Sequence, residues 1–295
     1  MHRLLTPVLV LGLSVTLAGP AAAEFHFSTG APDGRMATAS RPGGAGTIEI
    51  ESADDFIITG TATSIDHATF YGLIPEGTSL AEISQVRAEI YRVFPLDSTF
   101  PPSGQVLTRA NSPSDVAFAE RDSSVAGELT FSTSLLQTSF TAGNSVLNGI
   151  HPLPGARTGG EGPVTGQEVL FDVNLATPFL LPVGHYFFVP QVELATGDFY
   201  WLSAARPITV PGTPFAPDLQ SWIRNEDLSP DWLRVGADIV GGTPAPGFNA
   251  AFSLDGHVPE SASTGVLAGA AMLLLACVAR RRPMTPGPAG LVRRR

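Results

Sequence analysis

Glycine and proline interrupt this chain too often to favour long helices. The 295 residues include 31 glycines and 26 prolines, and only 15% of the residues are charged. Segments such as 101–104 (Pro-Pro-Ser-Gly) and 241–247 (Gly-Gly-Thr-Pro-Ala-Pro-Gly) separate runs of strand length. Both residues favour turns and disfavour helix interiors, so this distribution favours many short strands. A hydrophobic content of 43% is sufficient for a core.

Two segments alternate apolar and polar residues as a strand with one buried face does. In 168–175, Val169, Phe171 and Val173 share one face, and 248–255 repeats the pattern. Less regular strand candidates are 47–51, 56–62, 67–74, 86–94, 116–120, 128–132, 185–194, 199–202 and 232–235. We therefore predict an all-β fold, a two-sheet antiparallel sandwich of jelly-roll type.

Helical signals are few in the central part of the chain. Residues 79–82 have the form of a capping box, and 218–224 are long enough for two helical turns. Residues 143–166 are rich in Gly, Pro, Asn and Thr and predict a long mobile loop. No repeat of fixed period and no internal boundary divides this part, so we predict one ectodomain over 24–257.

The N-terminal segment has the form of a signal peptide. A basic start is followed by the apolar stretch 4–17, and Ala21 and Ala23 fit the A-x-A rule for cleavage. We therefore expect residues 1–23 to be removed during export. The alternative is an uncleaved anchor helix.

The C-terminal segment combines an apolar run with a basic cluster. Residues 265–279 are apolar and are followed at once by Arg280, Arg281 and Arg282. As a helix the run would be about 22 Å long, against a hydrocarbon core of about 30 Å, so it predicts a short transmembrane helix. The positive-inside rule places the arginines in the cytoplasm and the ectodomain outside. We expect the remaining tail, 283–295, to be basic and disordered.

Val258, Pro259 and Glu260 precede this apolar run. Together with the short helix and the arginines they resemble a PEP-CTERM sorting signal over 258–282, although Ser261 stands where that family has a second proline. The resemblance implies recognition by an exosortase, a processing enzyme in the inner membrane of Gram-negative bacteria that make extracellular polysaccharide. It also implies delivery to the outer envelope or matrix. The alternative is a plain C-terminal membrane anchor.

The central part of the chain is strongly acidic. From Glu24 to His257 there are 26 acidic residues and 10 arginines, a net charge of −16. Such a surface repels phosphate backbones, so we exclude nucleic acid as a partner. The single cysteine, Cys277, lies in the C-terminal apolar run, which excludes thiol catalysis, cysteine-ligated zinc and disulfides in the ectodomain.

An acidic cluster is the best candidate for a metal site. Glu51, Asp54 and Asp55, with Glu49 and Asp66 nearby in the sequence, offer carboxylate oxygens of the kind that Ca²⁺ binds. We therefore consider a structural calcium ion and expect no other cofactor. The alternative is a solvated strand edge, where charges discourage pairing with another sheet.

Three tryptophans are candidates for a sugar-binding surface. Trp201, Trp222 and Trp232, with Tyr200, could stack on the apolar faces of sugar rings if they were exposed in a row. The alternative is that they pack in the core.

No catalytic motif is present: the chain has no G-x-S-x-G elbow and no H-E-x-x-H pair, and His26, His67, His151 and His185 are scattered. We therefore expect no enzyme. We predict an exported structural or adhesive protein, anchored to the envelope or associated with the matrix. The alternatives are a polysaccharide-binding module and a polysaccharide hydrolase or lyase, whose carboxylate pair would be assembled by the fold.

Overall fold

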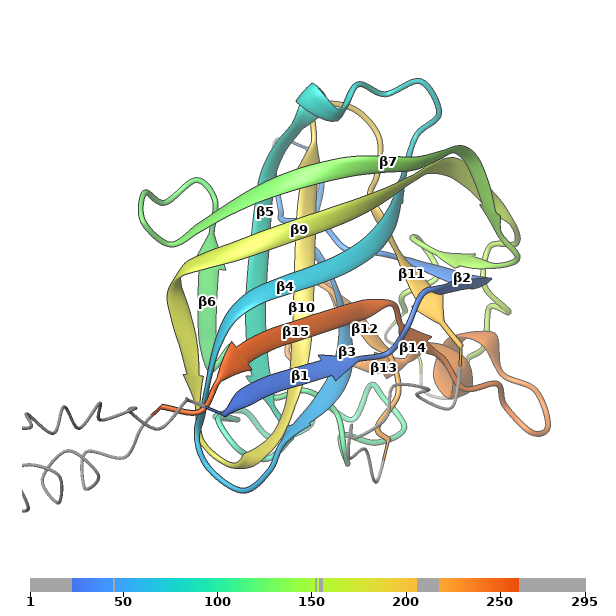
Figure 1. Cartoon of the computed structure of the whole chain (residues 1–295). Helices are drawn as coiled ribbons and strands as arrows, with labels where there is room; N and C mark the ends of the chain where they lie inside the picture. The colour runs from blue at the N-terminus through green and yellow to red at the C-terminus, as the bar shows by residue number, and fades with distance from the viewer. Residues whose placement is uncertain (1–22, 45, 152, 154–155, 206–217, 260–295) are drawn as a thin grey trace, which may run out of the picture.

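A computed structural model describes residues 23–44, 46–151, 153, 156–205 and 218–259. These residues form two β-sheets that pack face to face (Figure 1), which confirms the predicted all-β, two-sheet fold. All strand pairings are antiparallel except that of β2 with β8. The expected signal peptide, C-terminal helix and basic tail lie outside the described residues, apart from Ala23, Val258 and Pro259. Within the described ranges, no helix is long and apolar enough to cross a membrane.

The sheet nearer the viewer in Figure 1, here called the front sheet, is built around β4. Strand β4 pairs with β9 on one side and with β15 and β11 on the other, and β7 continues the sheet beyond β9. The strands of this sheet are β1 (Glu24–Ser28), β2 (Pro32–Ala39), β4 (Thr63–Ile74), β7 (Leu129–Ala142), β8 (Ser145–Val146), β9 (Val164–Leu181), β11 (Tyr200–Ala204), β14 (Asn249–Ala250) and β15 (Phe252–His257).

The second sheet, here called the back sheet, has the order β13-β12-β3-β10-β5-β6. Its strands are β3 (Ile50–Ile58), β5 (Ile83–Arg92), β6 (Ala119–Asp122), β10 (Gly184–Leu194), β12 (Trp222–Asn225) and β13 (Leu233–Arg234). Two short helical turns complete the described part, η1 (Leu80–Glu82) and η2 (Val235–Val240). The capping box predicted at 79–82 is confirmed, because Ser79 and Glu82 make both of its reciprocal hydrogen bonds.

Aromatic side chains fill the space between the sheets. The alternation in β9 directs Phe171 inward, where it stacks on Phe70 of β4 with a centroid distance of 4.7 Å and meets the edge of Phe199 at 5.3 Å. Phe188 and Phe252 stack at 5.4 Å deeper in the same cluster. Burial of these rings is the main stabilising contribution in a body whose sequence contains no cysteine.

The two ends of the described body meet in the front sheet. Strands β1 and β15 pair along their whole length, with Glu24 opposite His257. The pairing extends one step further, because the Val258 N–H donates to the Ala23 carbonyl at 2.9 Å. Both chain ends therefore leave the sandwich at the same place (Figure 1).

Each predicted strand overlaps an observed strand, but the bounds often differ and several predictions are wrong. The separate candidates 47–51 and 56–62 belong to one strand, β3. The helix predicted at 218–224 is absent, because Trp222 and Arg224 pair with β3 as part of β12. The loop predicted at 143–166 is irregular over most of its described residues, but it also contains β8 and the start of β9. Strands β1 and β2 were not predicted, and β2 contains both Pro32 and Gly34, which favour turns.

We expect Phe171→Ala to lower the free energy of unfolding by about 3–5 kcal/mol, because it removes a fully buried ring and leaves a cavity. Val183→Ala, at a side chain that is 56% exposed, serves as the control and should change it by less than about 0.5 kcal/mol. Urea unfolding of both variants, followed by tryptophan fluorescence, measures the difference. Equal effects would show that the two sheets do not share this core.

Candidate functional site

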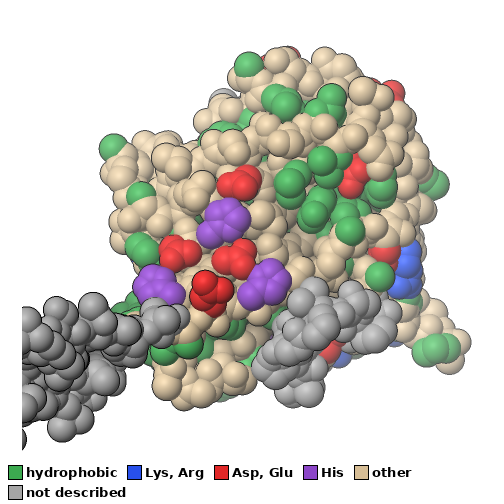
Figure 2. All heavy atoms as spheres, viewed as in Figure 1, with side chains coloured by type: hydrophobic (Ala, Val, Ile, Leu, Met, Phe, Trp, Pro, Cys, Tyr) green, Lys and Arg blue, Asp and Glu red, His purple; other side chains and the backbone are tan. Residues whose placement is uncertain are grey.

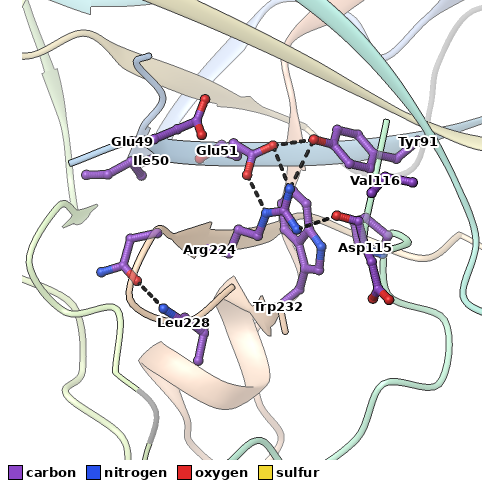
Figure 3. Close-up of polar contacts among 12 residues, drawn as sticks. Glu49, Ile50, Glu51, Tyr91, Asp115, Val116, Arg224, Leu228 and Trp232 are labelled. Atoms are coloured by element: carbon purple, nitrogen blue, oxygen red, sulfur yellow. Dashed lines mark hydrogen bonds and ion pairs between the residues drawn. The ribbon is translucent and has the colours of Figure 1, made fainter. Parts of the chain in front are cut away.

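Charged side chains are buried on the face of the back sheet that points away from the front sheet (Figure 3). Glu51 of β3 and Arg224 of β12 are register partners there, and each is nearly buried. The Arg224 guanidinium binds both Glu51 oxygens, with Nη2 3.1 Å from Oε1. We call Glu51, Tyr91, Arg224 and Trp232 the Arg224 network.

Two further hydrogen bonds of Arg224 reach Tyr91 and Asp115, so that each of its three nitrogen atoms has a partner. Its Nη2 donates to the Tyr91 hydroxyl at 3.0 Å, and its Nη1 donates to the Asp115 carbonyl at 3.1 Å. The Tyr91 hydroxyl in turn donates to Glu51 at 2.5 Å. The Trp232 ring lies over the guanidinium, with its centroid 4.3 Å from Cζ. Arg224 therefore links β3 and β5 to the two segments that cover them, which contain Asp115 and Trp232.

Burial and neighbouring charges shift the pKa values around this network. Burial raises the pKa of Glu89 well above its ordinary value of 4.5, and the charge of Glu51 raises it further. Burial and then Glu51 also raise the pKa of Tyr91. Burial by itself would lower the pKa of Arg224, but Glu51, Tyr91 and Glu89 together outweigh it, and the pKa is raised. Arg224 is thus held as a cation, whereas Glu89 favours its neutral form.

A second buried arginine fixes the covering segments. Arg109 contacts Asp115 through Nη2 at 2.7 Å and Asp231 through Nη1 at 2.8 Å, and all three side chains are at most 1% exposed. Asp115 is also held by the Phe100 N–H at 2.9 Å. Burial by itself would raise the pKa of Asp115, but the hydrogen bonds from Phe100 and Arg109 lower it below its ordinary value.

The three residues predicted to bind calcium are not brought together around one point. Glu51 is engaged by Arg224, and Asp54 and Asp55 point to opposite faces of β3. Asp54 accepts from the Ala250 N–H at 2.7 Å, while Asp55 lies 2.5 Å from Nε2 of His185. Burial raises the pKa of both aspartates. In the part of the chain that the structure describes, no group of three or more His, Asp or Glu residues is arranged to hold a metal ion.

The alternative interpretation of these acids, a solvated strand edge, is wrong. Strand β3 has neighbours on both sides, β12 and β10. Glu51, Asp54 and Asp55 are 4%, 0% and 0% exposed. The acids stay buried because each has hydrogen-bond partners from elements that are distant in the sequence.

The tryptophans are buried, so the prediction of an exposed sugar-stacking row is wrong and the core interpretation is confirmed. Trp201 packs edge-on against Phe188 and Phe252 between the sheets. Trp222 and Trp232 lie on the far face of the back sheet, where they contact arginines. Each indole N–H donates to a backbone carbonyl, so none is available to a ligand.

An exposed row of histidine and aspartate side chains crosses the front sheet (Figure 2). Strand pairing places His26 opposite Asp255 and Asp255 opposite His67. Nδ1 of His26 is 2.5 Å from Asp255, and His67 lies between Asp255 at 3.3 Å and Asp172 at 3.2 Å. A further pair, His257 and Asp66, is 3.0 Å apart. A neutral imidazole has one N–H, so the two contacts of His67 can both be hydrogen bonds only when its ring carries two protons.

Sequence reasoning missed this row because it depends on which strands are neighbours. His26 stands between Phe25 and Phe27, and this alternation does indicate an outward-facing side chain. Its partner Asp255 is 229 residues away, so only the pairing of β1 with β15 brings them together.

The Arg224 network has the residue types of an acid–base site, but its surroundings do not suit a polymer substrate. Glu51, Glu89 and Tyr91 are each less than 5% exposed and lie beneath covering segments, so a polysaccharide chain has no access to them. The geometry supports a structural role for the network. No known family model matches this chain, and no curated protein matches its sequence.

We expect Arg224→Met to lower the free energy of unfolding by about 3–5 kcal/mol, because it leaves the Glu51 carboxylate buried without its cation. The double variant Glu51→Leu/Arg224→Met should recover most of this loss, because no buried charge remains. Urea unfolding of the single and double variants measures the coupling. Asp255→Asn, in the exposed row, serves as the control and should change the stability by less than about 1 kcal/mol. If Arg224→Met matched this control, the role given to the network would be wrong.

The raised pKa of Glu89 should make the free energy of unfolding depend on pH. Its pKa is raised in the folded chain, so above pH 4.5 the unfolded chain releases this proton while the folded chain keeps it. The stability that this proton contributes is therefore fully present below the ordinary pKa of 4.5. It is lost as the pH rises through the raised pKa of Glu89 in the folded chain. We expect the free energy of unfolding of Glu89→Gln to equal that of wild type at about pH 4 and to exceed it at about pH 8.

Urea unfolding across this pH range measures the effect. The matched control is Glu120→Gln, at the exposed residue opposite Glu89 on β6, which should leave the pH profile unchanged. A profile for Glu89→Gln parallel to that of wild type would contradict the assignment of this proton.

Proposed function

We propose that this chain is an exported protein whose β-sandwich is displayed on, or released from, the envelope of a Gram-negative bacterium. There it acts as a structural or adhesive component, associated with the matrix and its extracellular polysaccharide. The observation that carries the proposal is the position of the folded body between the two expected processing points. Strand β1 begins at Glu24, directly after Ala23, and β15 ends at His257, directly before Val258.

The pairing of the two terminal strands supports display from one attachment point. Because β1 and β15 are neighbours, the N-terminal leader and the C-terminal attachment segment would both join the body at one place. Removal of a leader ending at Ala23 would break the hydrogen bond from the Val258 N–H to the Ala23 carbonyl but would leave every residue pair of the β1–β15 ladder intact. The rest of the surface would then be free to contact the matrix.

The sorting step is part of the same proposal and is supported by the sequence resemblance. Val258, Pro259 and Glu260 would be recognised by an exosortase-type enzyme, while the apolar run enters the inner membrane, briefly or as an anchor. The cluster 280–282 would hold the segment with its basic end in the cytoplasm. The jelly-roll form of the sandwich also belongs to the proposal. It is supported by the chain crossing from sheet to sheet at β2–β3, β3–β4, β4–β5, β6–β7, β9–β10, β10–β11, β11–β12 and β13–β14.

The mass and location of the protein in its host test this proposal. We expect a mature N-terminus at Glu24, a C-terminus near Glu260, and recovery in the outer envelope or the extracellular fraction. Replacing Val258, Pro259 and Glu260 by alanine should leave an intact Arg295 in the inner membrane, because the processing motif is lost. Ser263→Ala, outside the motif, is the matched control and should be processed as wild type. Recovery of the unprocessed chain as a soluble cytosolic species would refute export.

A further inference from the structure

Strand β7 is an open edge of the front sheet. It runs over 14 residues and pairs with β9 on one side; within the described part of the chain no strand pairs with its other side. It forms the upper margin of the front sheet in Figure 1. Along Leu129–Leu135 its pairing with β9 is regular, and the register shifts only after Leu135. This stretch therefore offers unpaired backbone donors and acceptors along about 23 Å, at about 3.3 Å per residue.

This edge lacks the features that normally prevent pairing with another sheet. Its sequence, LTFSTSLLQTSFTA, contains no charged residue, no proline and no glycine. Natural sheets protect their edges with charges, prolines or very short strands. The other marginal strands of the described sheets follow this rule: β1 carries Glu24, β6 carries Arg121 between two acids, β13 has two residues including Arg234, and β8 has two residues. Strand β7 is thus the unprotected exception.

The exposed side chains of β7 add apolar surface to this open edge. Leu135 and Leu136 are 43% and 45% exposed, and Thr130, Ser132 and Ser134 are exposed on the same strand. Threonine and leucine next to an open ladder suit contact with another strand better than contact with water.

We propose that β7 joins two copies of this chain edge to edge, through antiparallel pairing of Leu129–Leu135 in each copy. The body from Glu24 to His257 carries a net charge of −16, so two copies repel each other, but an approach at β7 brings no charged side chain of this strand against the other copy. Pairing about the middle of the stretch places Ser132 opposite Ser132, Thr130 opposite Ser134 and Leu129 opposite Leu135. No like charges meet, and apolar residues face each other. The inference goes beyond the proposed function and does not rest on the route of export.

The full-length chain, purified in detergent, provides the test. Its protein mass by light scattering should be twice the 30.8 kDa of one chain. The double variant Ser132→Lys/Ser134→Lys should be a monomer, because the positive charges at 132 in the two copies would lie directly opposite each other, with those at 134 diagonally next to them. The matched control Ser124→Lys/Ala126→Lys adds the same charge at exposed positions in the loop before β7 and should remain a dimer.

Two further measurements make the result specific to β7. Amide hydrogen exchange of Leu129–Leu135 should slow as the wild-type concentration rises and should not change with concentration in the Ser132→Lys/Ser134→Lys variant. A cooperative thermal transition close to that of wild type is expected for this variant, because both changes are at exposed residues, and it would show that the variant is folded. A monomeric wild type, a dimer that persists in the edge variant, or protection of β7 that requires another protein would each overturn the proposal. Its failure would leave the processing test above unaffected.

Discussion

The pairing of Glu51 with Arg224 is the constraint on which the covered face of the back sheet depends. Register between β3 and β12 places the two charges side by side, and the covering segments then remove both from water. An unpaired charge in that position would cost several kcal/mol, so only an arrangement that satisfies the guanidinium is stable. Its donors reach Tyr91 on β5 and the carbonyl of Asp115. One ion pair thereby fixes a strand order and a loop position together.

The same logic extends to the loops themselves. Arg109 contacts both Asp115 and Asp231. These two aspartates belong to covering segments that are far apart in the sequence. The region from Glu24 to His257 contains no cysteine, so its long connections have no covalent constraint. Buried, fully hydrogen-bonded arginines limit the positions that these connections can take, because any other position would leave a buried charge without a partner. In this fold they act through specificity more than through added stability.

The sequence alone indicates features that are local to one strand, but it does not indicate which strands are neighbours. Alternation predicted the strands around Val169 and Phe252 correctly because a period of two residues is a property of the strand alone. The partner of Glu51 is 173 residues away, and nothing near Glu51 distinguishes a buried, paired carboxylate from a solvated or calcium-binding one. The same gap misled the interpretation of Trp222, whose exposure was set by segments that only the fold places over it. Strand neighbours, and therefore sites built across strands, required the structure.

The position of β15 links the sandwich to its proposed tether. Strand β15 lies between β1 and β4 and is bonded to both, so a chain held beyond Val258 would be held through an inner strand. A pull along β15 would load the hydrogen bonds on both of its sides together, as well as Phe252 and Leu254 in the core. A terminal strand at the margin of a sheet would instead be bonded on one side only. The fold therefore places a strand that is bonded on both sides next to the proposed point of attachment, and leaves the open edge β7 at the opposite margin of the sheet.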